Sequence, residues 1–165
     1  MARGVVTQVN DTGKTVFTNT AVVNFSSANI KQWRQRTVDN YTTITYSGGG
    51  LLADYLAVWN NLAGSAFIVA GDFGISCGGL VGYATFNNAG TFRKSVHTGI
   101  TTFPGGVSLT NYGTVDIRSG ILAANGGYVS SSNALLNCAL GGTTPGTGHG
   151  QLQVAGTVTL NGALS

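Results

Sequence analysis

The chain has no glutamate, and charged residues make up only 8% of its 165 residues. Surface helices usually depend on Glu, Lys and Ala, so this shortage argues against helices. The chain is instead rich in Gly, Thr and Asn, with 26, 21 and 14 copies. Thr favours pleated strands, whereas Gly and Asn favour tight turns. The composition therefore predicts an all-β fold with little or no α-helix.

Long apolar runs and dense charge are also lacking. No run reaches the length of about 18 consecutive apolar residues that a transmembrane helix needs, so we expect no membrane span. The net charge is +3, and only the stretch 31–36 (KQWRQR) combines several basic residues with an aromatic one. A nucleic-acid surface needs a denser basic stripe, so we expect no nucleic-acid partner. We interpret this stretch as a solvated loop or an end cap.

Carboxylates are too few for hydrolytic or lyase chemistry. Glycoside hydrolysis needs a pair of carboxylates, and calcium-dependent chemistry needs several acidic oxygens. The five carboxylates are scattered along the chain: Asp11, Asp39, Asp54, Asp72 and Asp116. His97 and His149 have no Cys or carboxylate beside them that would complete a metal site. We therefore expect no enzymatic activity, no metal and no cofactor.

Five copies of one short pattern organise the chain. Each copy ends in an asparagine: Asn19, Asn40, Asn61, Asn88 and Asn111. Two positions earlier lies a large apolar residue: Phe17, Val38, Trp59, Phe86 and Leu109. Four positions later, or six in the third copy, lies a second apolar residue: Val23, Ile44, Phe67, Phe92 and Val115. Successive asparagines are 21, 21, 27 and 23 residues apart, a spacing typical of solenoid repeats.

The pattern predicts a parallel β-helix, or β-solenoid. Side chains alternate along a strand, so each asparagine shares the inner face with the apolar residue two positions earlier. Stacked at the strand spacing, the carboxamides can hydrogen-bond from coil to coil as a ladder, and Asn also tolerates left-handed turns. The two apolar sets form columns of the core. At about 23 residues per coil, the chain would contain about seven coils.

We expect a single domain over residues 1–165, with regular coils over 17–132 and a connector with terminal strands over 133–165. Variable segments, among them 119–132, would form the third side of the coils. Lys94 falls on an inward position of the fourth copy, which predicts either a bulge or a lysine stem that lies along the core. Cys77 and Cys138 are more than two coils apart, so we expect free thiols.

The end of the sequence carries no polar cap, since the chain stops at Ser165 directly after NGAL. A solenoid normally covers its last coil, because a bare end presents a layer of unpaired backbone groups. We therefore expect either a truncated piece of a longer chain or a subunit that associates end to end.

The runs ATFNNAGTFRKS (84–95) and VSLTNYGTVD (107–116), with the tail 144–158, resemble repeats of large secreted bacterial proteins. Those proteins are haemagglutinin-like and autotransporter-passenger-like surface proteins built on a right-handed parallel β-helix. The resemblance covers about residues 17–165. It implies an extracellular or cell-surface location and a structural or adhesive role, and it transfers no catalytic residue to this chain.

Our functional hypothesis is a non-enzymatic β-solenoid segment of a surface protein or of a self-assembling fibre. The alternative is a carbohydrate-binding or polysaccharide-degrading module, because exposed tyrosines can stack on sugar rings. Four tyrosines are the candidates for glycan contact: Tyr41, Tyr112, Tyr83 and Tyr128. The two hypotheses differ in whether polar and aromatic residues of several coils converge on one groove.

Overall fold

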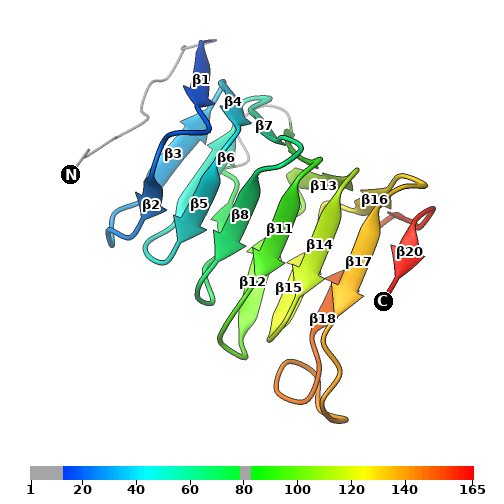
Figure 1. Cartoon of the computed structure of the whole chain (residues 1–165). Coiled ribbons are helices and arrows are strands. Elements are labelled where there is room, and N and C mark those ends of the chain that lie inside the picture. The colour runs from blue at the N-terminus through cyan, green and yellow to red at the C-terminus, as the bar shows by residue number, and fades with distance from the viewer. Residues whose placement is uncertain (1–12, 79–82) are drawn as a thin grey trace.

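The structure, a computed structural model, describes residues 13–78 and 83–165. These residues form strands and turns without a helix, and all the strands that pair do so in parallel, as the sequence predicts. The chain winds through three sides in each coil, so that strands three apart in the sequence become neighbours (Figure 1). No helix that could cross a membrane is found in the described residues.

Two seven-stranded sheets run the length of the stack (Figure 1). The first sheet contains β1 (Lys14–Phe17), β4 (Thr37–Asn40), β7 (Val58–Asn61), β10 (Ala84–Asn88), β13 (Val107–Asn111), β16 (Tyr128–Ser130) and β19 (Val158–Thr159). The second sheet contains β2 (Val23–Phe25), β5 (Thr43–Tyr46), β8 (Ala66–Val69), β11 (Thr91–Lys94), β14 (Thr114–Ile117), β17 (Leu135–Cys138) and β20 (Ala163–Leu164).

The third side is divided into two three-stranded sheets. One contains β3 (Lys31–Arg34), β6 (Leu51–Asp54) and β9 (Ile75–Ser76), and the other contains β12 (Ile100–Phe103), β15 (Ile121–Ala124) and β18 (Gln151–Val154). The basic stretch that we interpreted as a solvated loop or end cap therefore largely forms strand β3. Its Trp33 is buried and its ring lies 5.2 Å from that of Trp59.

The apolar columns form the core between the three sides. Trp59 stacks on Phe86 at 5.9 Å between ring centroids, and Phe67 stacks on Phe92 at the same distance. Each pair lies in register on neighbouring strands, as the repeat predicts. Phe103 of the third side meets Phe86 edge to face at 5.4 Å. Burial of large aromatic side chains is the main source of stability in such a core.

The corner between the first two sheets needs very small residues. A Cβ atom on Gly113 would collide with the carbonyl oxygen of Gly90 in the coil before it. The third copy contains two more residues at this corner than the second, yet Ile44, Phe67 and Phe92 remain in register. The extra residues are therefore absorbed by the turn and do not shift the strands.

The first coil departs from the predicted register. Phe17 pairs with Asn40 rather than with Val38, whereas Val23 still pairs with Ile44. The turn between β1 and β2 is therefore two residues longer than the corresponding turn of the second coil. Asn19 lies in this turn and is exposed, so its assignment to the ladder is wrong. Phe17 is half-buried and packs against the core from the asparagine position.

Each long sheet stacks seven strands, so the coil number agrees with the seven expected, although the last coil contains only β19 and β20. The connector 139–150 forms a loop that adds no strand to either long sheet. The paired strands also extend beyond residue 132, since β17 pairs with β14 and β20 pairs with β17. Residues 128–130, expected on the third side, form β16 of the first sheet.

Lys94 keeps the regular register and does not form a bulge. It pairs with Val69 and Ile117, and its side chain is fully buried. The amine donates to Asp72 Oδ1 at 2.7 Å and to the Gly71 carbonyl at 3.2 Å. The aliphatic stem thus contributes to the core while the charge reaches an acceptor at the corner.

Candidate functional site

Four asparagines form a ladder inside the first sheet. Asn40 Nδ2 donates to Asn61 Oδ1 at 2.8 Å, Asn61 Nδ2 to Asn88 Oδ1 at 2.7 Å, and Asn88 Nδ2 to Asn111 Oδ1 at 2.8 Å. All four side chains are fully buried. They occupy the positions assigned from the sequence, which predicted the carboxamide chain from the repeat alone.

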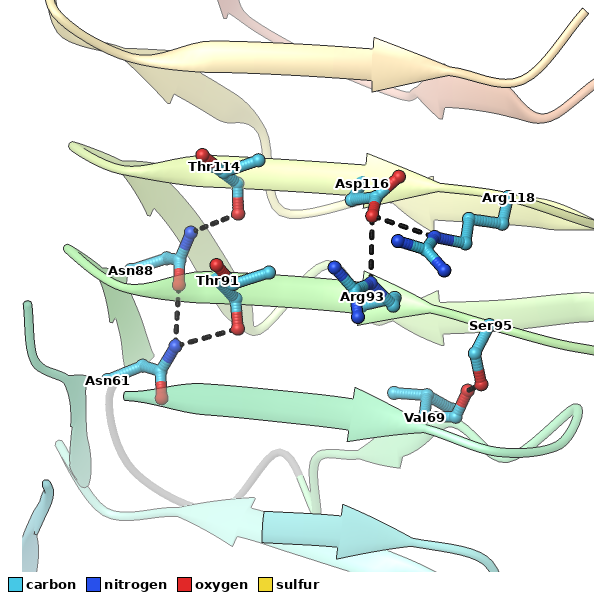
Figure 2. Close-up of polar contacts among 9 residues, drawn as sticks. All are labelled: Asn61, Val69, Asn88, Thr91, Arg93, Ser95, Thr114, Asp116 and Arg118. Carbon is cyan, nitrogen blue, oxygen red and sulfur yellow. Dashed lines mark hydrogen bonds and ion pairs between the residues drawn. The ribbon is translucent and has the colours of Figure 1, made fainter. Parts of the chain in front are cut away.

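Each carboxamide also joins the first sheet to the second. Asn61 Nδ2 donates to the Thr91 carbonyl at 3.0 Å and Asn88 Nδ2 to the Thr114 carbonyl at 2.8 Å, as Figure 2 shows. These acceptors lie on strands of the second sheet one coil further along. A buried donor left without an acceptor costs about 1–3 kcal/mol, so the ladder makes the corner geometry stringent.

The ladder is closed at both ends by an aromatic residue. In the first coil the asparagine position is taken by Phe17, which pairs with Asn40. At the other end Asn111 Nδ2 donates to the Tyr128 hydroxyl at 3.1 Å. Ser130 occupies the next asparagine position, and it pairs with Asn111. Tyr128 is fully buried, and burial raises its pKa. The proposal that Tyr128 contacts a glycan is therefore wrong.

A second ladder runs along the outer face of the same strands. Asn60 Nδ2 donates to Asp39 Oδ1 at 2.8 Å, and Asn87 Nδ2 donates to Asn60 Oδ1 at 3.0 Å. Lys14 forms an ion pair with the Asp39 carboxylate. The donors of this outer ladder point toward the N-terminal coils, whereas those of the inner ladder point toward the C-terminal coils. The carboxamide dipoles of the two ladders therefore oppose each other.

The charges at the Asp39 end of the outer ladder support each other. Burial alone would raise the pKa of Asp39, but the Asn60 and Lys14 hydrogen bonds and the Lys14 charge lower it below its usual value. The hydrogen bond to Asp39 raises the pKa of Lys14, and the Coulombic attraction of Asp39 and of Tyr41 adds to it. Tyr41 thus lies close enough to interact with this ion pair.

A polar cluster lies on the outer face of the second sheet. Arg93 Nε and Arg118 Nε both donate to Asp116 Oδ2, at 2.8 and 3.0 Å (Figure 2). Arg93 and Asp116 are register partners on β11 and β14. The cluster links neighbouring coils and leaves one net positive charge.

A shallow groove lies at the corner of the first three coils. It is lined by Val16, Thr18, Asn19, Tyr41, Ala63 and Gly64. Tyr41 and Asn19 were both singled out from the sequence, the first for glycan contact and the second for the ladder. The structure brings them together because the longer first turn places Asn19 beside the corner that follows β4.

The other tyrosines do not converge on this groove. Tyr112 follows β13, three coils from Tyr41 along the same corner, and is similarly exposed. Tyr83 precedes β10 and is also exposed, and its ring lies near Gly106 on the side opposite that corner of the coil. Convergence of several exposed tyrosines on one binding surface is therefore not seen.

The acidic and sulfur-containing residues meet as a pair at one place, where Cys77 Sγ donates to Asp54 Oδ1 at 3.4 Å. No group of three or more His, Cys, Asp or Glu side chains suited to a metal ion occurs in residues 13–78 and 83–165. Asp39 lies on β4 and Asp116 on β14, in different sheets and three coils apart, and Asp11 lies outside the described residues. Cys77 and Cys138 are free thiols, and burial raises the pKa of Cys138.

No family model, curated protein or solved structure matches this chain. The functional assignment therefore depends on the geometry of the ladders and of the groove.

The outer ladder was missed from the sequence, although a signal for it exists. Three of the repeat asparagines are preceded directly by another polar amide or carboxylate residue: Asp39, Asn60 and Asn87. Because adjacent residues of a strand face opposite sides, a doublet repeated at the coil spacing indicates one ladder on each face.

Proposed function

We propose that the chain is a non-enzymatic structural segment, a stiff piece of a β-solenoid rod in a surface protein or fibre. The observation that carries this proposal is the buried asparagine ladder, which passes through four successive coils without interruption. Each carboxamide bonds to the coils beside it, so one coil cannot tilt without breaking buried hydrogen bonds.

The size of the solenoid favours a role within something longer. Neighbouring coils are about 4.8 Å apart, so seven stacked strands rise only about 29 Å. A rod of that length spans little distance, and end-to-end association or continuation in a longer chain would extend it. The likeness of the repeats to secreted bacterial β-helix proteins supports an extracellular or cell-surface location.

Negative-stain electron microscopy of the purified chain over a concentration series tests the proposal. Filaments of uniform solenoid width that lengthen with concentration would support end-to-end association. Short particles of one size would support a segment that acts within a longer chain. Irregular or flexible particles would contradict the proposal of a stiff rod.

A charged substitution on the last strand tests whether filaments form by specific end-to-end stacking or by nonspecific adhesion. Leu164 lies on β20, the last strand of the second sheet, and is 76% exposed. Lysine on an edge strand opposes pairing with another chain, so Leu164→Lys should shorten or abolish filaments. Leu56→Lys is the matched control, since Leu56 is 68% exposed but lies in the turn between β6 and β7, away from both end strands of the sheet. Equal effects of the two substitutions would exclude stacking through this edge.

A further inference from the structure

We propose that the groove around Tyr41 binds a pyranose ring of a neutral polysaccharide. The groove spans the first three coils at the corner between the two long sheets. This inference does not depend on the rod proposal, because a solenoid segment can bind sugar whether or not it extends into a longer assembly.

The groove lies where the short turn of the second coil sits between two longer turns. From the inward position of the first sheet to that of the second, the chain takes six steps in the first and third coils but only four in the second. The longer turns contribute Thr18 and Asn19 on one side and Ala63 and Gly64 on the other, and the short turn carries Tyr41. A Cβ atom on Gly64 would meet nothing within 4 Å, so this side is open.

Tyr41 supplies an aromatic surface between these turns. Its side chain is 48% exposed, while its backbone nitrogen donates to the Phe17 carbonyl at 2.9 Å. The residue before it is Asn40, which the inner ladder holds in place. The ring therefore projects from a fixed backbone, which reduces the entropy lost on binding. Exposed Val16 enlarges the apolar surface on which the C–H face of a sugar can pack.

Hydrogen-bonding side chains of the first turn lie beside this apolar surface. Within the described part of the chain, the Asn19 side chain has no hydrogen-bond partner. A carboxamide offers two donors and one acceptor oxygen, which suits neighbouring sugar hydroxyls. The Thr18 hydroxyl lies 3.3 Å from that of Thr20 and can also bond to a ligand. An aromatic face flanked by an amide and a hydroxyl is the chemistry that recognises a sugar ring.

The charges favour a neutral ligand. Among residues 13–78 and 83–165, the ions near Tyr41 are Lys14 and Asp39, which neutralise each other in an ion pair. Asp39 is in addition buried and bonded to Asn60, so it is not free to bind a cation or a basic peptide. A second copy of the chain is also a poor occupant, because a stable protein interface covers about 800 Å² on each partner. Val16 and Tyr41 are the exposed large apolar residues of the groove.

Saturation-transfer difference NMR on the full chain tests the proposal. The probes are the neutral hexasaccharides of cellulose, xylan, mannan and starch, with hexagalacturonate as the anionic comparison. We expect binding of at least one neutral probe, with saturation strongest at ring C–H protons, and weaker or no binding of hexagalacturonate. Failure of all four neutral probes, or preference for the anionic one, would overturn the proposal.

Variants then locate the site. Tyr41→Ala should weaken binding about tenfold, whereas Tyr41→Phe should keep most of it because the ring remains. Tyr112→Ala is the matched control, since Tyr112 follows Asn111 as Tyr41 follows Asn40 and is 53% exposed. Equal loss in the two alanine variants would contradict the proposed site.

A substitution that removes no contact distinguishes a loss of binding from misfolding. Ala63 is exposed at the edge of the groove, so Ala63→Gln should fill the groove and weaken binding while leaving the unfolding midpoint nearly unchanged. Unchanged sugar binding in this variant would place the ligand elsewhere. Sedimentation of the wild type provides a further test, because a dimer that Tyr41→Ala or Ala63→Gln abolishes would identify a second copy as the occupant and overturn the proposal.

Discussion

Asn87 and Asn88 are neighbours on β10, and each donates its carboxamide to another carboxamide, yet they lie on opposite sides of the first sheet. Asn88 is fully buried, whereas Asn87 faces the outside. Water can replace a hydrogen bond lost on the outer face, but nothing replaces one lost inside. The same bond in the same strand should therefore stabilise the fold on one side and contribute little on the other. Phe86, next to Asn87 on the same strand, provides a reference for core packing.

Phe86→Ala should have the largest effect on the unfolding free energy, and it provides the reference for substitutions on the inner face of the sheet. Phe86 is fully buried among Trp59, Phe67, Phe92 and Phe103. Removal of a buried phenyl ring costs about 3–5 kcal/mol of unfolding free energy. Urea unfolding followed by circular dichroism measures it. A cost below that of the Asn88 substitution would mean that the ladder, and not the aromatic core, dominates stability.

Asn88→Ala tests whether the inner ladder is required. It removes the donor to Asn111 and to the Thr114 carbonyl and the acceptor for Asn61. Unsatisfied buried groups remain on both sides, so the unfolding free energy should fall by about 2–3 kcal/mol. The same urea titration measures the change. A loss no greater than that of Asn87→Ala would break the comparison between the two faces.

Lowering the pH tests how much Asp39, at the charged end of the outer ladder, contributes to stability. The pKa of Asp39 is lower in the folded chain than its ordinary value of 3.8. Its contribution to stability is therefore present above pH 3.8 and is lost as the pH falls through the lower folded pKa. The wild type should therefore lose more stability than Asp39→Asn in this window, and the difference should be small because solvent screens the exposed Lys14. Unfolding free energies of both proteins between pH 2 and 5 measure the difference; parallel curves would contradict it.

Asn87→Ala should have the smallest effect. Asn60 loses one donor, but its oxygen can bind water instead. We expect a change of less than about 0.5 kcal/mol in the unfolding free energy. A larger loss, measured beside Asn88→Ala under the same conditions, would show that the outer ladder is structurally important despite its exposure.

The interior coils could be predicted from the sequence because one residue type recurs where the backbone register requires it. Asn61, Asn88 and Asn111 are in register, and the apolar columns follow them. The first coil could not be predicted, because Phe17-Thr18-Asn19 resembles the other copies but is followed by a longer turn. Strand register is set by pairing and by inward packing along the whole strand, so one asparagine in a turn does not predict the register.

The sixth coil and the groove were missed for different reasons. Tyr128 lies in a copy whose asparagine position is occupied by Ser130, so the search for asparagines passed over it. The groove depends on how far neighbouring turns project, which is a three-dimensional property of coils 21 or more residues apart. Tyr41 could be singled out as an exposed aromatic residue, but its pairing with Asn19 required the structure.

The constant register combined with variable spacing has a consequence for engineering and for divergence. Ladder partners are separated by 21, 27 and 23 residues, yet their hydrogen bonds have nearly the same length. The extra residues lie in connections outside the two long sheets. Doubling the length of such a connection costs only about 0.6 kcal/mol in closure entropy. The loop 139–150, between β17 and β18, is therefore a suitable position for grafting a foreign peptide onto an otherwise unchanged scaffold.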